Sequence, residues 1–148
     1  MTPWPPGPGV VELPDERRVR GRGLRTGTTA AMAPDMGCYL LGRAPAPTPW
    51  PAVWVRWSDF GLPAEEASAL AALAAAFDQC AEQRVEVACR GGRGRTGCAL
   101  AVLAVLSGVP AADAVSWVRA VYHPRAVETP WQRRWVRGLD ADRIRAAR

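Results

Sequence analysis

The sequence predicts an α/β fold with a central, mostly parallel sheet flanked by helices. Short segments rich in Val and Trp alternate with longer apolar segments at helical spacing, and a Gly-rich turn joins one short segment to an almost wholly apolar one. The 148 residues suit a single domain. Because strand, helix, strand, turn and buried helix follow in a βαβ-like order, we expect helices on both faces of the sheet.

Most strands are predicted in the N-terminal half. Residues 1–9 are rich in Pro and Gly and should form a flexible arm, followed by a single domain over residues 10–148. Four prolines make residues 43–51 a loop. β-Branched and aromatic residues indicate strands over residues 10–13, 18–24, 36–41, 53–57 and 84–89.

The first helices are predicted from apolar spacing and from their start signals. Pro63 should open a helix, with Glu65 and Glu66 in its first turn, where the helix dipole favours acids. Residues 95–107 are almost wholly apolar and indicate a helix that is buried on all sides. A further helix is expected over residues 110–122.

The last helix has the clearest start signal. Thr129 and Gln132 form a capping box, with Pro130 at the first helical position. One stripe of this helix should carry Trp131, Trp135 and Leu139.

Composition excludes several classes of protein. Hydrophobic residues make up 49% of the chain and charged residues 22%, which is ordinary for a globular domain. The longest apolar runs, 69–77 and 98–106, are too short to span a membrane, and no secretory pattern opens the chain, so we expect a cytoplasmic protein without membrane insertion. All 19 basic residues are Arg, and the net charge of +5 is interpreted first as solvated surface Arg, with attraction to anionic partners as the alternative. No basic block is long enough to indicate nucleic-acid binding.

The four cysteines form no metal or disulfide pattern. No C-x-x-C pair occurs and the chain has one His, which argues against a zinc site, and without a secretory signal we expect no disulfide framework. Cys38, Cys80 and Cys98 are expected to be inert, apolar side chains. Cys89 is the candidate nucleophile because of where it lies in the sequence.

Cys89 ends a predicted strand and is followed by a turn that can hold an oxyanion. Gly91, Gly92 and Gly94 allow the backbone to curl so that its N–H groups point inward. The positive end of the next helix faces the same point, so we expect a lowered pKa for the Cys89 thiol. The residues expected to bind substrate are Arg90, Gly91, Gly92, Arg93, Gly94 and Gly97.

Arg95 and Thr96 complete the candidate site. The Arg95 guanidinium can bind two oxygens of a tetrahedral anion, and Thr96 can donate to the sulfur when it leaves as a thiolate. Two other interpretations are a plain Gly-rich connection with surface Arg and an RGG-like RNA contact. A Walker A loop is excluded because the chain has no Lys.

Cys89-x5-Arg95-Thr96-Gly97 resembles the C-x5-R-[ST]-G signature loop of the cysteine-dependent protein tyrosine phosphatase superfamily. About 30 residues upstream, Trp57-Ser58-Asp59-Phe60-Gly61-Leu62-Pro63 resembles the W-P-D-F-G-x-P loop of the same family, with Ser58 in place of the first Pro. This resemblance implies that Asp59 is the general acid. The other interpretation of Asp59 is a turn or capping residue.

A third similarity to the family concerns the positioning of water in the second step of the reaction, and one departure concerns the activation of the Cys89 thiol. Gln132 resembles the family's water-positioning glutamine, although its capping role explains it equally well, and Glu128 stands where some members carry a glutamine. Ala88 replaces the His that usually precedes the nucleophile, so we expect weakened activation of the thiol. The lone His123 is interpreted as a loop residue.

The resemblance implies a compact, dual-specificity-like phosphatase that needs no metal or cofactor. Cys89 would form a thiophosphoryl intermediate with phosphotyrosine, or also phosphoserine or phosphothreonine, in a protein, and the oligomeric state is left open. Arg90 and Arg93 flank the loop positions at which phosphoinositide phosphatases carry basic residues, so a phosphoinositide or inositol phosphate is the alternative substrate. Two further hypotheses are a non-catalytic phosphate-binding module and a rhodanese-type sulfurtransferase, the latter disfavoured by Gly94.

Overall fold

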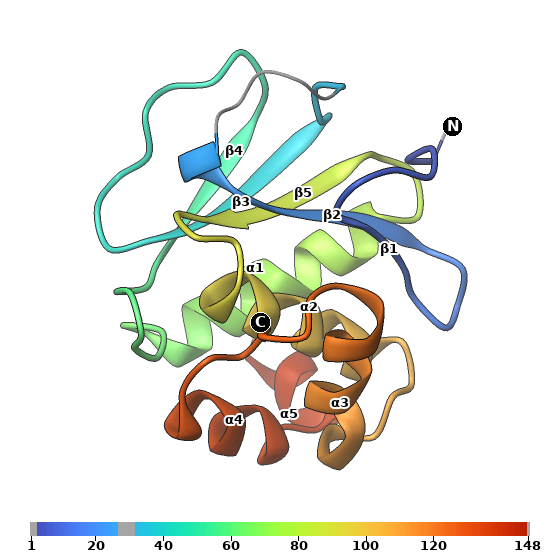
Figure 1. Ribbon diagram of the computed structural model, residues 1–148, viewed down its shortest axis with the longest axis vertical. Helices are drawn as coiled ribbons and strands as arrows, with labels where there is room; N and C mark the ends of the chain where they lie inside the picture. The colour runs from blue at the N-terminus through green and yellow to red at the C-terminus, as the bar shows by residue number, and fades with distance from the viewer. Residues whose placement is uncertain (1–2, 27–31, 148) are drawn as a thin grey trace.

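The computed structural model describes residues 3–26 and 32–147, and its strands form one sheet in the order β1-β2-β5-β3-β4 (Figure 1). β1 runs antiparallel to β2, whereas β2, β5, β3 and β4 are parallel to one another. The predicted mostly parallel sheet is therefore confirmed. The strands are β1 (Val10–Glu12), β2 (Arg18–Gly23), β3 (Met36–Leu41), β4 (Ala52–Arg56) and β5 (Val85–Cys89).

Because four strands are parallel, the loops that follow them meet at one edge of the sheet. β2 is followed by Arg25, β3 by Arg43, β4 by Asp59 and β5 ends on Cys89. Residues far apart in the sequence are thus brought to a common edge by the sheet alone.

The α-helices pack on one side of the sheet, below it in Figure 1, so the expectation of helices on both faces was wrong. The reason lies in the connections. Among the described residues, one α-helix joins β4 to β5, and no α-helix is found between β3 and β4 or in the described part of the segment between β2 and β3. The helices are α1 (Glu66–Gln79), α2 (Gly94–Leu106), α3 (Ala111–Val121), α4 (Pro130–Arg137) and α5 (Ala141–Ala146), and a short 3-10 turn, η1 (Leu24–Thr26), follows β2.

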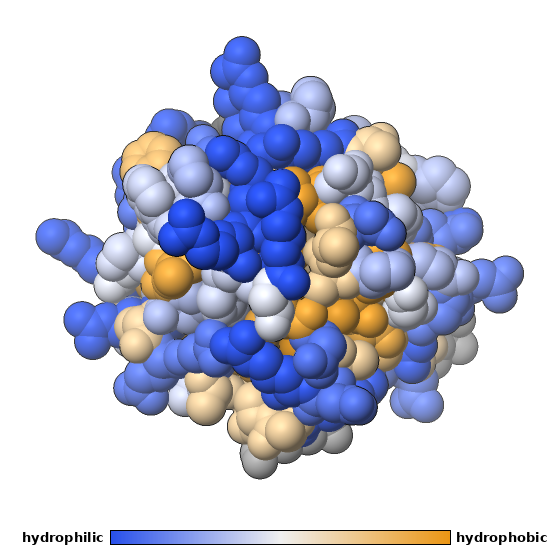
Figure 2. Space-filling model, turned by 90° about the horizontal axis from the view of Figure 1, so that it is seen from below, coloured by the Kyte–Doolittle hydropathy of each residue, from blue (hydrophilic) through white to orange (hydrophobic). Residues whose placement is uncertain are grey.

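α2 is the central helix, and its residues from Gly94 to Val105 are buried, as its apolar sequence predicts. It packs against β5 and β2 and is surrounded by α1, α3, α4 and α5. Those outer helices carry the polar surface: Figure 2, seen from the helical side, shows hydrophilic residues over most of this face. The start of α2, next to Cys89, is therefore held firmly by the core.

Two details of the helices differ from expectation. Pro63 does not open α1 but forms a β-bridge with Trp57, and the helix begins at Glu66. The bridge folds the loop after β4 back on itself, which delays the helix start. α4 is not the last helix, because α5 follows it, and α4 buries Gln132 rather than Trp131, which is 49% exposed.

The face of the sheet opposite the helices carries a buried ionic network. The Glu86 carboxylate accepts hydrogen bonds from Arg20 Nη2 at 2.6 Å, Arg22 Nε at 2.5 Å and Tyr39 Oη at 2.8 Å. Trp4 of the N-terminal arm is buried there, and its indole donates to the Val85 carbonyl at 2.9 Å. These contacts cover β5 on the side that the helices leave uncovered.

Candidate active site

Cys89 lies at the carboxyl end of β5, and two donors point at its sulfur. Gly92 N lies 3.1 Å from Cys89 Sγ, and Thr96 Oγ1 lies 3.0 Å from it. The side chain is buried, with 2% of its surface exposed. A main-chain amide and a hydroxyl directed at one sulfur suit a negatively charged acceptor.

Arg95 lies in the first turn of α2, and each nitrogen of its guanidinium group has a different environment. Its Nη1 donates to the Trp57 carbonyl at 2.9 Å, and its Nη2 lies 3.4 Å from Asp59 Oδ1. Its Nε is buried and, among the described residues, has no hydrogen-bond partner. A buried donor without a partner is costly, so this N–H indicates a place for an acceptor that a ligand would supply.

Asp59 is placed over the Cys89 loop by the segment after β4. The carboxylate is 50% exposed and contacts Arg95 on one side, while its Oδ1 also accepts the Phe60 amide at 3.0 Å. Phe60 has a φ of 60°, which is unusual for a bulky residue, so the segment turns sharply directly after the carboxylate.

Three side chains donate hydrogen bonds to the backbone carbonyls of Phe60 and Gly61, directly after Asp59. Gly61 O accepts the Trp57 indole at 2.8 Å and the Gln132 amide at 2.9 Å, and Phe60 O accepts the Trp131 indole at 2.6 Å. The first turn of α4 therefore fixes the position of the Asp59 loop. The predicted capping box of α4 is confirmed by its hydrogen bonds.

A pocket of about 300 Å³ opens over the sulfur. Two acids face it, Asp59 and Glu128, together with the ring of Phe60, which is 56% exposed. In the sequence, Glu128 stands out only as a departure from the family pattern. The sequence does not predict that Glu128 lines this pocket. The full lining is Arg25, Asp59, Phe60, Cys89, Gly91, Arg93 and Glu128.

The other sequence-predicted site residues are distributed around the loop. Arg90 lines a neighbouring cavity together with Asp59 and Arg95. Gly94 lies against Glu128, because a Cβ added there would come within 2.5 Å of the Glu128 Oε1. Gly97 faces the backbone of Val127, so its lack of a side chain serves the packing of α2.

Gln132, for which the sequence leaves a water-positioning and a capping role open, does not line the pocket over the Cys89 sulfur. Its side chain is fully buried, with the amide nitrogen on Gly61 O and the amide oxygen accepting from Thr129 N at 3.2 Å. Both ends of the amide are occupied, so its hydrogen bonds serve the Asp59 loop and the start of α4.

The Cys89 loop has two supports that the sequence did not reveal. Tyr122 donates its hydroxyl to Gly92 O at 2.6 Å, and Arg25 donates its backbone N–H to Arg90 O at 2.9 Å. Burial raises the pKa of Tyr122, and the nearby Cys89 raises it further, so its hydroxyl stays a donor. Only knowledge that β2 lies beside β5 could have pointed to Arg25.

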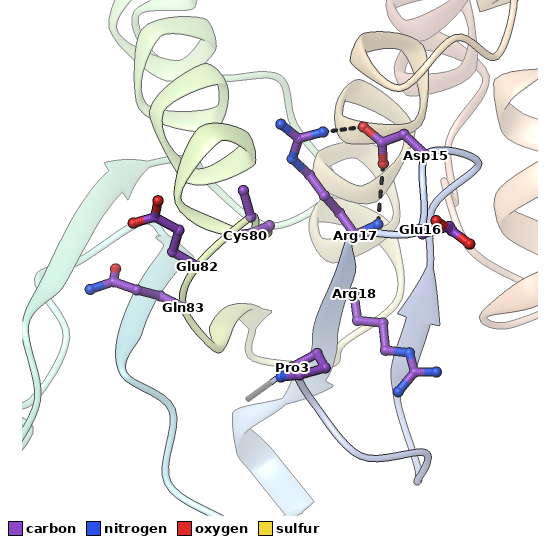
Figure 3. Close-up of a pocket in the computed structure, with 9 residues that line it drawn as sticks. Pro3, Asp15, Glu16, Arg17, Arg18, Cys80, Glu82 and Gln83 are labelled. Carbon is purple, nitrogen blue, oxygen red and sulfur yellow. Dashed lines mark hydrogen bonds and ion pairs between the residues drawn. The ribbon is translucent and has the colours of Figure 1, made fainter. Parts of the chain in front are cut away.

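The remaining cysteines are buried away from such donors, as expected. Burial raises the pKa of Cys38 and of Cys80 to about 12, and it also raises the pKa of Cys98. Cys80 borders a pocket of about 370 Å³ at the end of α1, where Asp15 and Arg17 pair with each other (Figure 3). That pocket offers no activated nucleophile.

Two features are absent from the described residues, 3–26 and 32–147. No cluster of at least three His, Cys, Asp or Glu side chains suited to hold a metal ion is present there. No helix in that part of the chain combines the length and apolar character needed to cross a bilayer.

Comparison with known proteins gives a family match. Residues 47–129 match the family model described as protein-tyrosine phosphatase, a stretch that includes Asp59 and the whole Cys89 loop. The chain is also similar to a crystal structure of Tk-PTP in the active form, with a TM-score of 0.66 and 21% identity over 92% of this chain and 98% of that one. At this level of identity, the similarity shows a shared fold.

Two curated relatives come from Methanocaldococcus jannaschii, and both are uncharacterized proteins. They are 37% and 36% identical to this chain over 86 residues, which is 58% of its length. The matched stretch spans about half the length of these relatives, 53% and 57%.

Proposed function

The chain belongs to the protein-tyrosine phosphatase family, and on this premise we propose that it hydrolyses phosphotyrosine in proteins. The observation that carries the proposal is the Asp59 carboxylate 3.4 Å from Arg95, over a loop whose donors point at Cys89. Nucleophile, anion-binding group and acid thus surround one pocket.

In the first step, the Cys89 thiolate attacks phosphorus in line with the ester oxygen. A P–S bond forms and the P–O bond to the leaving group breaks. The loop amides and the free Nε of Arg95 hold the equatorial oxygens as charge moves onto them. Asp59, protonated at this stage, gives its proton to the leaving oxygen.

In the second step, water attacks the phosphorus of the thiophosphoryl intermediate, and the P–S bond breaks. Asp59, now ionised, takes a proton from the water, and the sulfur returns to the thiolate state, where Gly92 N and Thr96 Oγ1 stabilise it. Glu128 faces the same pocket, and we propose that it assists in placing this water, because Gln132 is fully buried and does not line the pocket.

An aryl phosphate suits the walls of the pocket. Phe60 exposes 56% of its surface beside the sulfur, so the ring of a phosphotyrosine can pack on it. We propose that the enzyme works in the cytoplasm, where reduced thiols persist, because all four cysteines are free and buried.

Hydrolysis of p-nitrophenyl phosphate by purified wild type and by Cys89→Ser and Asp59→Ala variants tests the proposal. Cys89→Ser should abolish turnover, because the nucleophile is lost. Asp59→Ala should lower kcat by about 10²–10³-fold for aryl phosphates with poor leaving groups, and less for good ones.

Cys38→Ser is the matched control, because Cys38 is also buried but belongs to β3 rather than to the Cys89 loop or to α2. It should keep the activity of the wild type. Equal rates for wild type and Cys89→Ser would exclude the mechanism, and phosphotyrosine peptide binding without any turnover would show that the chain is a non-catalytic phosphate-binding module.

A further inference from the structure

The site has a second cavity, of about 510 Å³, that meets the catalytic pocket at Asp59. It lies between the loop after β3 and the Cys89 loop. Its wall on the β3 side is formed by Leu41 and the first part of the Pro-rich segment, and its other side by Ser58, Asp59, Arg90 and Arg95. A group bound at Cys89 could therefore extend into this cavity without leaving the protein surface.

The two cavities differ in charge. Two arginines and two acids line the catalytic pocket, so these side chains balance one another. Three arginines, Arg43, Arg90 and Arg95, and one acid, Asp59, line the side cavity, which leaves an excess of two positive charges. Asp59 already contacts Arg95. Within the described ranges, the guanidinium groups of Arg43 and Arg90 form no ion pair.

We infer that the side cavity binds a second anionic group of the substrate, a phosphate or carboxylate on a residue near the phosphotyrosine. This inference rests on the proposed function and adds a substrate class to it. Arg43 and Arg90 provide the charge and the directed N–H donors, while Pro45 and Ala46 give an apolar surface for the peptide.

The charge distribution favours a peptide over an inositol phosphate. A ring that bears phosphates on several sides would place one of them beside Glu128 or Asp59, where like charges repel. A peptide can carry its second anion in one direction only, toward Arg43. The cavity therefore fits a linear substrate with one acidic neighbour.

The test compares phosphotyrosine peptides that carry phosphoserine, Asp or Ala at each position from −3 to +3. For wild type, at least one phosphoserine or Asp peptide should have a kcat/KM about tenfold above its Ala counterpart, as one charge-assisted hydrogen bond predicts. Arg43→Gln should reduce this ratio to about one. The preference should also weaken as salt is added, since the cavity is open to solvent.

Arg56→Gln is the matched control, because Arg56 is an exposed residue of β4 that borders a different pocket. It removes the same charge and should keep the wild-type ratio. A wild type that prefers none of the doubly anionic peptides, or an Arg43→Gln variant that retains the preference, would overturn the inference. So would faster hydrolysis of an inositol polyphosphate or of phosphoinositide vesicles than of every peptide.

Failure of the inference is distinguishable from failure of the proposed function. If p-nitrophenyl phosphate and the Ala peptides are hydrolysed but no second anion is preferred, only the subsite is wrong. If wild type hydrolyses none of these compounds, the proposed function itself fails.

Discussion

At the scale of single residues, the position of Asp59 depends on two carbonyl groups next to it in the chain. Phe60 O and Gly61 O together accept three side-chain hydrogen bonds, from Trp57, Trp131 and Gln132. Two of the donors belong to the first turn of α4, far along the chain. Trp131 is the exposed member of this set, so its bond is the one that water can replace most easily.

Trp131→Phe should therefore loosen the Asp59 loop while leaving the core intact. We expect kcat to fall about three- to tenfold for aryl phosphates with poor leaving groups and to change little for good ones, because only the former depend on the acid. A plot of log kcat against leaving-group pKa for both proteins measures this.

Trp54→Phe is the control for this prediction. Trp54 is also exposed, and its indole donates to Leu41 O at 2.8 Å. An equal loss for all leaving groups, or the same loss in Trp54→Phe, would contradict the proposed role of Trp131.

Arg95 and Gln132 show how far single residues could be predicted from the sequence. Arg95, Thr96 and Cys89 follow one another in a short segment, so their meeting needed only a local turn, and the structure brings them together. For Gln132 the sequence leaves a capping role and a water-positioning role open; the structure confirms the capping role and adds a hydrogen bond to Gly61 O in the Asp59 loop, about seventy residues away. That contact depends on tertiary packing, which no local pattern encodes.

At the scale of elements, strands and buried helices were predicted to within a few residues because hydrophobic periodicity is a local signal. The start of α1 was placed at Pro63, but a β-bridge to Trp57 overrides the usual preference for proline at a helix start. The contribution of Glu128 to the pocket was missed, because it depends on how α4 packs against α2.

The Cys89 loop provides a matched pair of glycine substitutions. Gly92 has a φ of 76°, and a Cβ there would lie 2.5 Å from Gly23 N, whereas a Cβ on Gly91 would meet no atom within 4 Å. Gly92→Ala should lower kcat/KM by about 10²–10³-fold, the cost of losing an aligned oxyanion donor. Gly91→Ala should stay within a few-fold of wild type, and equal effects of the two would contradict this account.

Glu86 holds β5 in register from the face opposite the helices. Burial alone would raise its pKa, but hydrogen bonds from Arg22, Arg20 and Tyr39 outweigh burial, and its pKa is lowered. Glu86→Gln leaves two arginines without their carboxylate, so we expect a loss of about 3 kcal/mol in the free energy of unfolding, measured by urea denaturation at pH 7. Glu82→Gln, at an exposed position, should cost less than about 0.5 kcal/mol.

The difference in the free energy of unfolding between wild type and Glu86→Gln should depend on pH, with a sign that follows from the lowered pKa of Glu86. The folded-state pKa lies below the unfolded value of about 4.3, so the contribution of Glu86 is fully present above that value. It is lost as the pH falls through the lowered, folded-state pKa. The stability gap between wild type and Glu86→Gln should therefore narrow below about pH 4.

At the scale of the whole molecule, one mostly parallel sheet brings the loops that carry Asp59 and Cys89 to one edge, and α2 anchors that edge in the core. The buried Arg95 Nε has no hydrogen-bond partner among the described residues, and in the proposed function a bound oxyanion supplies one. Because such an ion binds the folded chain alone, it should stabilise the entire domain.

Tungstate at about 100 times its dissociation constant should contribute about 2.7 kcal/mol, or about 5–10 °C in Tm for a domain of this size. Differential scanning fluorimetry measures the shift. Arg95→Ala should lose most of it, while Arg56→Ala should retain it. A full shift in Arg95→Ala would show that the anion binds elsewhere.

The bond between Trp131 and Phe60 O also has a spectroscopic consequence. Any displacement of the Phe60 backbone must transfer this exposed indole from a carbonyl to water, and indole emission responds to such a change. The difference in stopped-flow fluorescence between wild type and Trp131→Phe would then record the opening and closing of the acid segment during turnover, without any attached dye.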